Sequence, residues 1–178
     1  MRPAPQLPEK PEQPGPVEGG DLRHQAILGS RSCNWPDEAA CAADAAALAH
    51  KPALRDAFIA LHGPLGAGKT SFVRHLLRAL GVAGRIKSPT YAVLEPHEVG
   101  DLAISHFDFY RFNDPREWAD AGFRDLFAAP GLKLAEWAEN AEALLPTPDL
   151  RLSIAPLDES SRQVLWTAHS ARGLELIA

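Results

Sequence analysis

The feature that most constrains this chain is a loop with the pattern Gly-x-x-x-x-Gly-Lys-Thr at residues 63–70. Glycine lets the backbone curl through positive φ angles and bring successive N–H groups close to phosphate oxygens. In such a loop Lys69 carries a positive charge to the β- and γ-phosphates, and the Thr70 hydroxyl is placed to hold Mg²⁺. We therefore predict a phosphate-binding loop (P-loop) for a nucleotide, with binding residues Gly63, Gly66, Ala67, Gly68, Lys69, Thr70 and Ser71.

Both flanks of the loop fit this interpretation. Residues 57–61 form a short apolar run that is typical of a buried strand. After the loop, apolar residues fall on one helical face, Arg74 and Arg78 fall on the other, and Gly81 ends the helix. The positive end of the helix dipole favours an anion at the loop. A glycine-rich turn that matched by chance would not need this order of strand, loop and helix.

The composition predicts one folded domain preceded by a tail. The chain has 178 residues, 46% hydrophobic and 23% charged, enough for one core and too few for two ordinary domains. Residues 1–28 begin with a proline-rich stretch that we expect to be extended or disordered, and residues 29–178 form the P-loop domain. No apolar run suits a signal peptide or approaches the ~18 residues of a membrane span, so a cytoplasmic protein is expected.

Charge and cysteine content narrow the function classes. The net charge of −5 and the pI of about 5.8 argue against a protein that grips nucleic acid by itself, because phosphate contacts need clustered Lys and Arg. Any RNA connection is therefore expected to run through a partner. Cys33 and Cys41 have no second Cys or His at metal-ligand spacing, so we interpret them as reduced thiols.

The rest of the chain alternates predicted helices and strands. A helix is expected to enter at residues 34–38 and to run to about Ala49, and a short helix is expected at residues 114–122. The predicted strands cover residues 91–94, 102–107 and 132–135, and a final hairpin covers 149–155 and 163–169. This order predicts a three-layer α/β P-loop NTPase fold with a mostly parallel central sheet and an antiparallel C-terminal hairpin at its edge.

Ligands of such a sheet bind at the carboxyl ends of its strands, where two acids and a threonine are expected. Asp108 ends the strand at 102–107, where P-loop enzymes place the acid that orders Mg²⁺; a turn-capping role is the alternative. Glu136 follows the strand at 132–135 and is predicted to bind Mg²⁺ or to orient the attacking water, against the alternative of a surface acid. Thr90 lies in a proline-stiffened loop that is placed to sense the γ-phosphate.

Two neighbouring side chains keep both interpretations open. Trp137 lies close enough in sequence to contact a nucleotide, although a tryptophan beside a strand is more often a packing residue. Arg111 follows Asp108 by three residues and is as readily a solvated side chain as a phosphate ligand. The catalytic set predicted from the sequence is therefore Lys69, Thr90, Asp108 and Glu136, and the Mg²⁺ set is Thr70, Asp108 and Glu136.

Four motifs stand in a fixed order: Gly66 to Thr70, Lys87-Ser88-Pro89-Thr90-Tyr91, His106-Phe107-Asp108-Phe109-Tyr110-Arg111, and Glu136-Trp137. Together they closely resemble the bacterial TsaE (YjeE) family over about residues 34–170. The resemblance implies an ATPase that works with TsaB and TsaD. Those proteins install threonylcarbamoyl on the adenosine beside the anticodon of tRNAs that read codons beginning with A, so tRNA would be met only indirectly, through the complex.

The resemblance also implies roles for three residues. The positions of Thr70 and Glu136 contact Mg²⁺ in that family, and the aspartate at the position of Asp108 is needed for activity. Two positions depart from the family pattern: Pro64 stands where relatives usually carry Asp, and Ala138 where many carry Pro. Position 64 is variable in P-loops and leaves the glycines and the lysine intact.

Two other functions share the P-loop. A small-molecule kinase would need an acceptor pocket and normally an arginine-rich lid, and the sequence has no such lid. A non-catalytic module could use bound nucleotide only to order a docking surface. A GTPase is disfavoured, because the Asn-Lys-x-Asp guanine motif does not occur in the sequence.

Overall fold

The computed structural model describes residues 25–178, so most of the predicted tail lies outside the described residues. The strands, in chain order, are β1 (Gly29–Trp35), β2 (Phe58–His62), β3 (Leu94–Val99), β4 (Leu102–Asp108), β5 (Leu132–Glu136), β6 (Leu150–Pro156) and β7 (Arg162–Ala168). The helices are α1 (Glu38–Ala49), α2 (Lys69–Leu80), α3 (Pro115–Asp120), α4 (Phe123–Ala128) and α5 (Ala171–Ile177). Short 3₁₀ turns cover Pro52–Asp56 and Ala138–Ala141.

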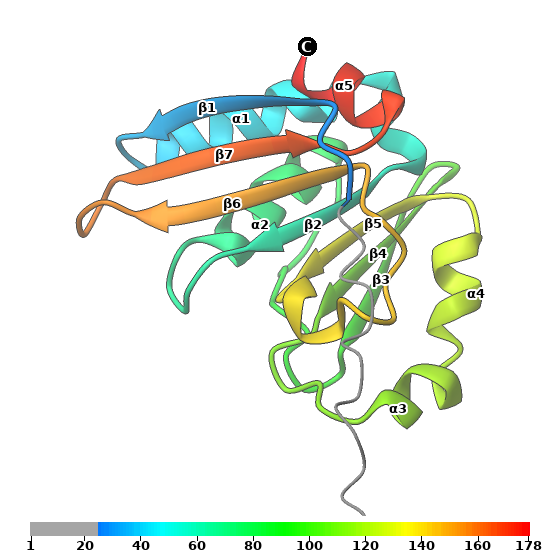
Figure 1. Ribbon diagram of the computed structural model, residues 1–178. Helices are drawn as coiled ribbons and strands as arrows, with labels where there is room; N and C mark the ends of the chain where they lie inside the picture. The colour runs from blue at the N-terminus through cyan, green and yellow to red at the C-terminus, as the bar shows by residue number, and fades with distance from the viewer. Residues whose placement is uncertain (1–24) are drawn as a thin grey trace, which may run out of the picture.

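All seven strands form one mixed sheet in the order β1-β7-β6-β2-β5-β4-β3 (Figure 1). The four central strands, β6, β2, β5 and β4, are mutually parallel. The predicted hairpin is β6 and β7, paired antiparallel, and β1 adds a further antiparallel strand outside it. The predicted fold class, a P-loop NTPase fold with a mostly parallel central sheet, is confirmed, and the hairpin lies one strand inside the edge.

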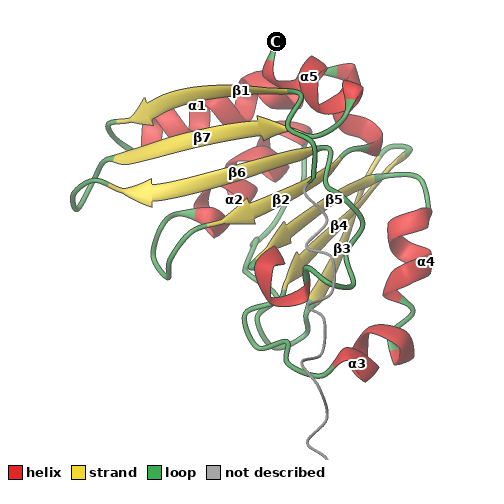
Figure 2. Cartoon of the chain, viewed as in Figure 1, coloured by secondary structure: helices red, strands yellow, loops and turns green. Residues whose placement is uncertain are grey.

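Helices cover both faces of the sheet and give it three layers (Figure 2). Side chains alternate along β2: Ile59 and Leu61 enter the core beneath α1, α2 and α5, while Phe58 and Ala60 enter the second core beside α3 and α4. A strand buried on both faces needs a continuous apolar run, which explains why residues 57–61 could be recognised from the sequence.

Helix boundaries follow from local capping. The Asp37 side chain accepts a hydrogen bond from the backbone N–H of Ala40 at 2.9 Å and so starts α1. Gly81 adopts a left-handed conformation with φ of 103° after α2, as predicted from its position after the last apolar residue. Asp114 caps α3 in the same way as Asp37 caps α1.

Several predicted boundaries were wrong. The strand expected at residues 91–94 begins only at Leu94, because the chain first turns and Val93 has a positive φ of 66°. The helix expected at 114–122 is broken at Gly122, whose φ of 68° starts the separate helix α4. Neither β1 nor α5 was predicted from the sequence. Residues 25–28, predicted as the end of the tail, contact the C-terminal hairpin: the Gln25 side chain accepts a hydrogen bond from Arg151 of β6 at 2.9 Å, and the Leu28 N–H donates to the Ala168 carbonyl of β7 at 2.8 Å.

Within residues 25–178, no helix has the length and apolar content needed to cross a membrane.

Candidate nucleotide-binding site

The P-loop joins the carboxyl end of β2 to the first turn of α2, as predicted. Gly63 and Gly68 have φ angles of 147° and 109°, which other residues rarely adopt. A Cβ on Gly63 would also lie 2.5 Å from the Ile154 carbonyl oxygen of β6, so the loop can pass this strand only as glycine. The first N–H groups of α2 lack intrahelical acceptors and are available to an anion.

Lys69, the first residue of α2, turns back over its own loop. Its Nζ donates to the carbonyl oxygens of Gly63 and Pro64, at 2.5 and 3.0 Å, and lies 3.7 Å from the centre of the Trp137 ring. The side chain is buried, and this burial lowers the pKa of Lys69 below its ordinary value. Trp137 itself has a positive φ of 55°, which turns its ring towards the lysine at the end of β5.

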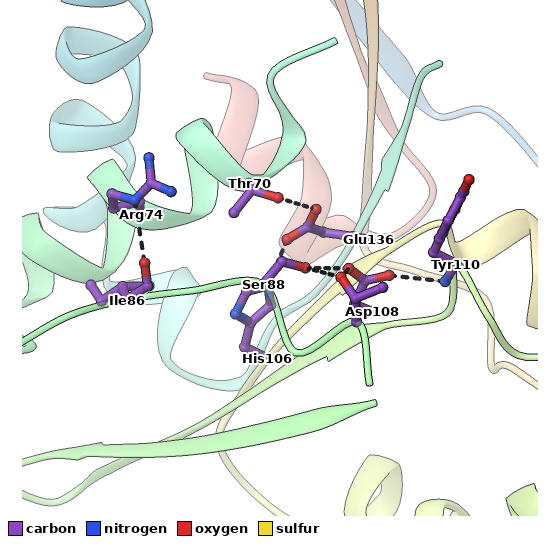
Figure 3. Close-up of polar contacts among 9 residues, drawn as sticks. Thr70, Arg74, Ile86, Ser88, His106, Asp108, Tyr110 and Glu136 are labelled. Carbon is purple, nitrogen blue, oxygen red and sulfur yellow. Dashed lines mark hydrogen bonds and ion pairs between the residues drawn. The ribbon is translucent and has the colours of Figure 1, made fainter. Parts of the chain in front are cut away.

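The hydroxyl of Thr70, the second residue of α2, contacts the carboxylate of Glu136. Thr70 Oγ1 donates to Oε2 of Glu136 at 2.7 Å, and Oε1 of the same carboxylate lies 2.7 Å from Nε2 of His106 (Figure 3). Glu136 and His106 are both buried. The prediction that Glu136 points into the crevice beside the P-loop is thus met by its position.

Asp108 occupies the matching end of the neighbouring strand, because β4 and β5 are in parallel register with Asp108 opposite Glu136. Its Oδ2 accepts hydrogen bonds from the hydroxyls of Ser88 and Thr90, the latter at 3.0 Å, and its Oδ1 accepts the backbone N–H of Tyr110 at 2.9 Å. These bonds connect the loop of residues 88–90, which we call the Ser-Pro-Thr loop, to the end of β4. The two predicted residues Thr90 and Asp108 are therefore bonded directly to each other, and we refer to them below as the Asp108–Thr90 unit.

These groups line one open cleft with a volume of about 310 Å³, within the range of about 300–1,000 Å³ typical of small-molecule sites. Trp137 lines the cleft, so its position agrees with the nucleotide interpretation. Arg111 does not line it; its guanidinium stacks on Tyr91, 4.4 Å from the ring centre. The lining residues are Leu65, Gly66, Ala67, Gly68, Lys69, Thr70, Ser71, Ser88, Thr90, Asp108, Tyr110, Glu136 and Trp137.

The donor set in this cleft suits Mg²⁺. Magnesium is held by one or two side-chain oxygens and completes its octahedron with phosphate oxygens and water. Thr70 Oγ1 and the Glu136 carboxylate, already 2.7 Å apart, provide such a pair. Asp108, predicted as a third metal residue, accepts hydrogen bonds from the hydroxyls of Ser88 and Thr90. Among the described residues, no group of three or more His, Cys, Asp and Glu side chains could hold a metal on its own.

Two further residues, Arg162 and His106, contact the site but were given no role from the sequence. Arg162, at the start of β7, donates from Nε to the Ala67 carbonyl oxygen at 2.8 Å and so braces the P-loop against the hairpin. A second hollow of about 320 Å³ adjoins the cleft; it is lined by Trp35, Asp37, Glu38, Cys41, Ala67, Gly68, Ser71, Glu159, Ser160 and Arg162. His106 is the other of these two residues. A single Arg or His on a strand gives no sequence signal for such contacts.

A phosphate-binding loop between β2 and α2, with acids at the ends of two adjacent parallel strands, defines a P-loop NTPase fold. The family model described as "Threonylcarbamoyl adenosine biosynthesis protein TsaE" matches residues 35–164. This chain therefore belongs to the TsaE family, which acts in the biosynthesis of tRNA threonylcarbamoyladenosine. The family resemblance seen in the sequence is confirmed.

Individual relatives agree with this assignment. The tRNA threonylcarbamoyladenosine biosynthesis protein TsaE of Haemophilus influenzae is 39% identical over 118 residues, which cover 66% of this chain and 68% of the relative. The protein of the same name from Bacillus subtilis is 34% identical over 110 residues, 62% of this chain and 68% of the relative. The crystal structure of Bacillus subtilis YdiB superposes with a TM-score of 0.68 and 25% identity, and covers 85% of this chain and 94% of YdiB.

Proposed function

We propose that this protein binds ATP with Mg²⁺ in the cleft and hydrolyses it, as the ATPase of the machinery that forms threonylcarbamoyladenosine in tRNA. One observation carries the proposal: Lys69, the Thr70–Glu136 pair and the Asp108–Thr90 unit all line the same cleft. They provide a cation for phosphates, oxygen ligands for a metal, and a second carboxylate at the end of the neighbouring strand. The three parts are those that phosphoryl transfer to water requires.

ATP would use both hollows. Its phosphates lie along the P-loop, where Lys69 exchanges its bonds to the Gly63 and Pro64 carbonyls for bonds to phosphate oxygens. The nucleoside extends into the second hollow, which shares Gly68 and Ser71 with the cleft. There Arg162 keeps the loop carbonyl of Ala67 in place through its 2.8 Å hydrogen bond.

The two carboxylates divide the chemistry. Glu136 is already bonded to Thr70, so we assign these two side chains to Mg²⁺. Bound Mg²⁺ neutralises charge that develops on the phosphate oxygens. Asp108 is assigned to the attacking water, which it orients and relieves of a proton, while Thr90 and Ser88 hold its carboxylate through their hydroxyls.

The partners are TsaD and TsaB, as the family resemblance implies. The protein acts with them in the cytoplasm. The net charge of −5 supports contact with tRNA through that complex rather than through this chain alone.

The test is ATP turnover by the purified protein, with and without TsaB and TsaD. Phosphate release to water, together with threonylcarbamoyl transfer to tRNA that depends on this protein, supports the proposal. Transfer of phosphate to an added small molecule would instead identify a kinase. Nucleotide binding without turnover, even with both partners present, would identify a binding module gated by nucleotide.

A further inference from the structure

His106 lies directly behind the carboxylate that we assign to the metal. It is a residue of β4, and its side chain is 0% exposed. Its Nε2 lies 2.7 Å from Oε1 of Glu136, whose Oε2 accepts the Thr70 hydroxyl at 2.7 Å. Figure 3 shows Glu136 between these two side chains. Both oxygens of the carboxylate are therefore held, one from the nucleotide side and one from the sheet.

The donor in the hydrogen bond between His106 and Glu136 can be assigned. An ionised carboxylate only accepts hydrogen bonds, so Nε2 of His106 is the donor. The other ring nitrogen, Nδ1, is buried and has no partner among the described residues. Leaving a buried polar atom without a partner destabilises the fold. An apolar side chain would avoid this cost at a core position, so the bond to Glu136 is the feature that distinguishes histidine here.

We propose that His106 is a positioning residue that fixes the rotation of the Glu136 carboxylate, so that Oε2 stays directed at Thr70 and at the Mg²⁺ of a bound nucleotide. This inference rests on the proposed function. The terminal torsion of a glutamate is broad, so without the imidazole the carboxylate is free to rotate. Hydrogen-bonding partners behind metal ligands typically contribute about 10–100-fold in metal affinity. The loss should fall on the Mg²⁺-dependent part of nucleotide affinity.

The experiment compares two amides. In His106→Gln the side-chain nitrogen reaches roughly as far as Nε2 does, whereas in His106→Asn it stops near Nδ1 and cannot contact Glu136. Both replacements are neutral and polar. His97→Asn is the matched control: His97 lies on the adjacent strand β3, and its buried Nε2 also has no partner within residues 25–178, but it does not bond to Glu136. His106→Leu, whose own side chain has no polar atom, replaces the asparagine variant if that variant does not fold.

The measurement is calorimetric titration with ADP, once in Mg²⁺ and once in EDTA. Wild-type protein that fails to bind ADP, or that gains nothing from Mg²⁺, overturns the proposed function and this role with it. Given a wild-type gain, we expect His106→Asn to lose about 10–100-fold of it, with affinity in EDTA unchanged. His106→Gln and His97→Asn should keep the gain. A full gain in His106→Asn, or an equal loss in His106→Gln, overturns the positioning role.

A double-mutant cycle separates this role from a general effect on the fold. In a Glu136→Gln background the Mg²⁺-dependent gain is already reduced. If His106 acts through Glu136, adding His106→Asn should cause no further loss of that gain. An additional loss of the same size as in the wild-type background would show that His106 acts independently of Glu136 and would overturn the inference.

Discussion

The ammonium group of Lys69 rests on the face of the Trp137 indole, 3.7 Å from the ring centre. The same nitrogen donates to two carbonyl oxygens of its own loop. The protein thus holds its phosphate-binding cation with acceptors of its own. A cation–π contact contributes about 0.5–2 kcal/mol, and ionised phosphate oxygens form stronger, charge-assisted bonds. An incoming phosphate should therefore draw Lys69 away from the indole.

This relationship makes Trp137 a reporter of phosphate binding. Titration with tripolyphosphate, which has no base to contact other tryptophans, should change the intrinsic fluorescence of the wild-type protein. Trp137→Phe should abolish the change. Trp35→Phe, which alters a buried tryptophan beside the second hollow, should leave it intact. A response that survives in Trp137→Phe would mean that Lys69 does not move from the ring when phosphate binds.

Lys69→Ala should weaken ATP binding by about 10- to 150-fold, since hydrogen bonds to a charged group are worth about 1.5–3 kcal/mol. The backbone cradle would remain. Isothermal calorimetry measures the affinity, and Arg78→Ala is the control, because Arg78 is exposed on the outer side of the same helix. Equal affinities for wild type and Lys69→Ala would contradict the assignment of this loop to phosphate.

The parts of this site that could be predicted from the sequence are those encoded locally. The P-loop needs glycines, a lysine and a threonine at fixed spacing, and each acid directly follows a recognisable buried strand. Parallel strands bring their carboxyl ends to one edge, so Asp108 and Glu136 could be expected to meet there. The register that places them opposite one another agrees with that expectation.

The parts that could not be predicted depend on contacts between distant segments. β1 is polar and exposed along much of its length, and it is a strand because it pairs with β7, which follows more than a hundred residues later. Arg162 reaches the P-loop only once the hairpin has folded beside it. His106 and Glu136 lie on different strands, β4 and β5, and come into contact only when these strands pair. Local patterns carry no information about any of these pairings.

Substitutions of Glu136 and Asp108 should affect different properties of the protein. Glu136→Gln should reduce the Mg²⁺-dependent gain in ADP affinity, since it removes the negative charge beside Thr70 but keeps an oxygen ligand. Asp108→Asn should keep that gain but lose ATP turnover by about 100-fold or more, the contribution typical of a general base. Calorimetry and phosphate release measure the two effects, and melting temperatures should change little. A drop in melting temperature that parallels the loss of activity would mark these residues as structural instead.

His62, the last residue of β2, should make stability depend on pH. Burial, followed by the charge of Arg151, lowers its pKa from 6.5 to about 4; the charge of Lys69 acts in the same direction, and Glu142 opposes them only in part. The unfolded chain therefore binds a proton before the folded one does. The stabilisation is complete above about pH 6.5 and is lost as the pH falls towards 4, with a slope of at most about 1.4 kcal/mol per pH unit.

Urea unfolding at pH 7 and at pH 4.5 tests this dependence. The wild type should lose more of its free energy of unfolding between these two values than His62→Gln does. His50→Gln removes an exposed histidine and should behave like the wild type. Parallel pH curves for the wild type and His62→Gln would show that His62 is not held neutral in the folded protein.

The last prediction concerns the rate of hydrolysis. Among the described residues that line the cleft, Lys69 is the one cationic side chain. Arg111 is stacked on Tyr91, which is 84% exposed, and Arg162 is bonded to the carbonyl oxygens of the loop. Among residues 25–178, therefore, no arginine is placed to stabilise charge on the γ-phosphate. An arginine supplied by a partner is worth about 10³–10⁵ in rate in other P-loop enzymes.

The protein alone should accordingly hydrolyse ATP slowly, and the TsaB and TsaD pair should accelerate it. Leu65 lines the cleft, Tyr91 directly follows Thr90 in the chain, and both side chains are exposed. A partner that covers both would therefore also order Thr90 against Asp108. Steady-state assays across a titration of the pair measure the effect, with Arg111→Ala as a control that should leave the slow basal rate unchanged. A rate that stays flat while the complex forms would exclude activation by these partners, and would leave nucleotide-gated docking as the function of the cleft.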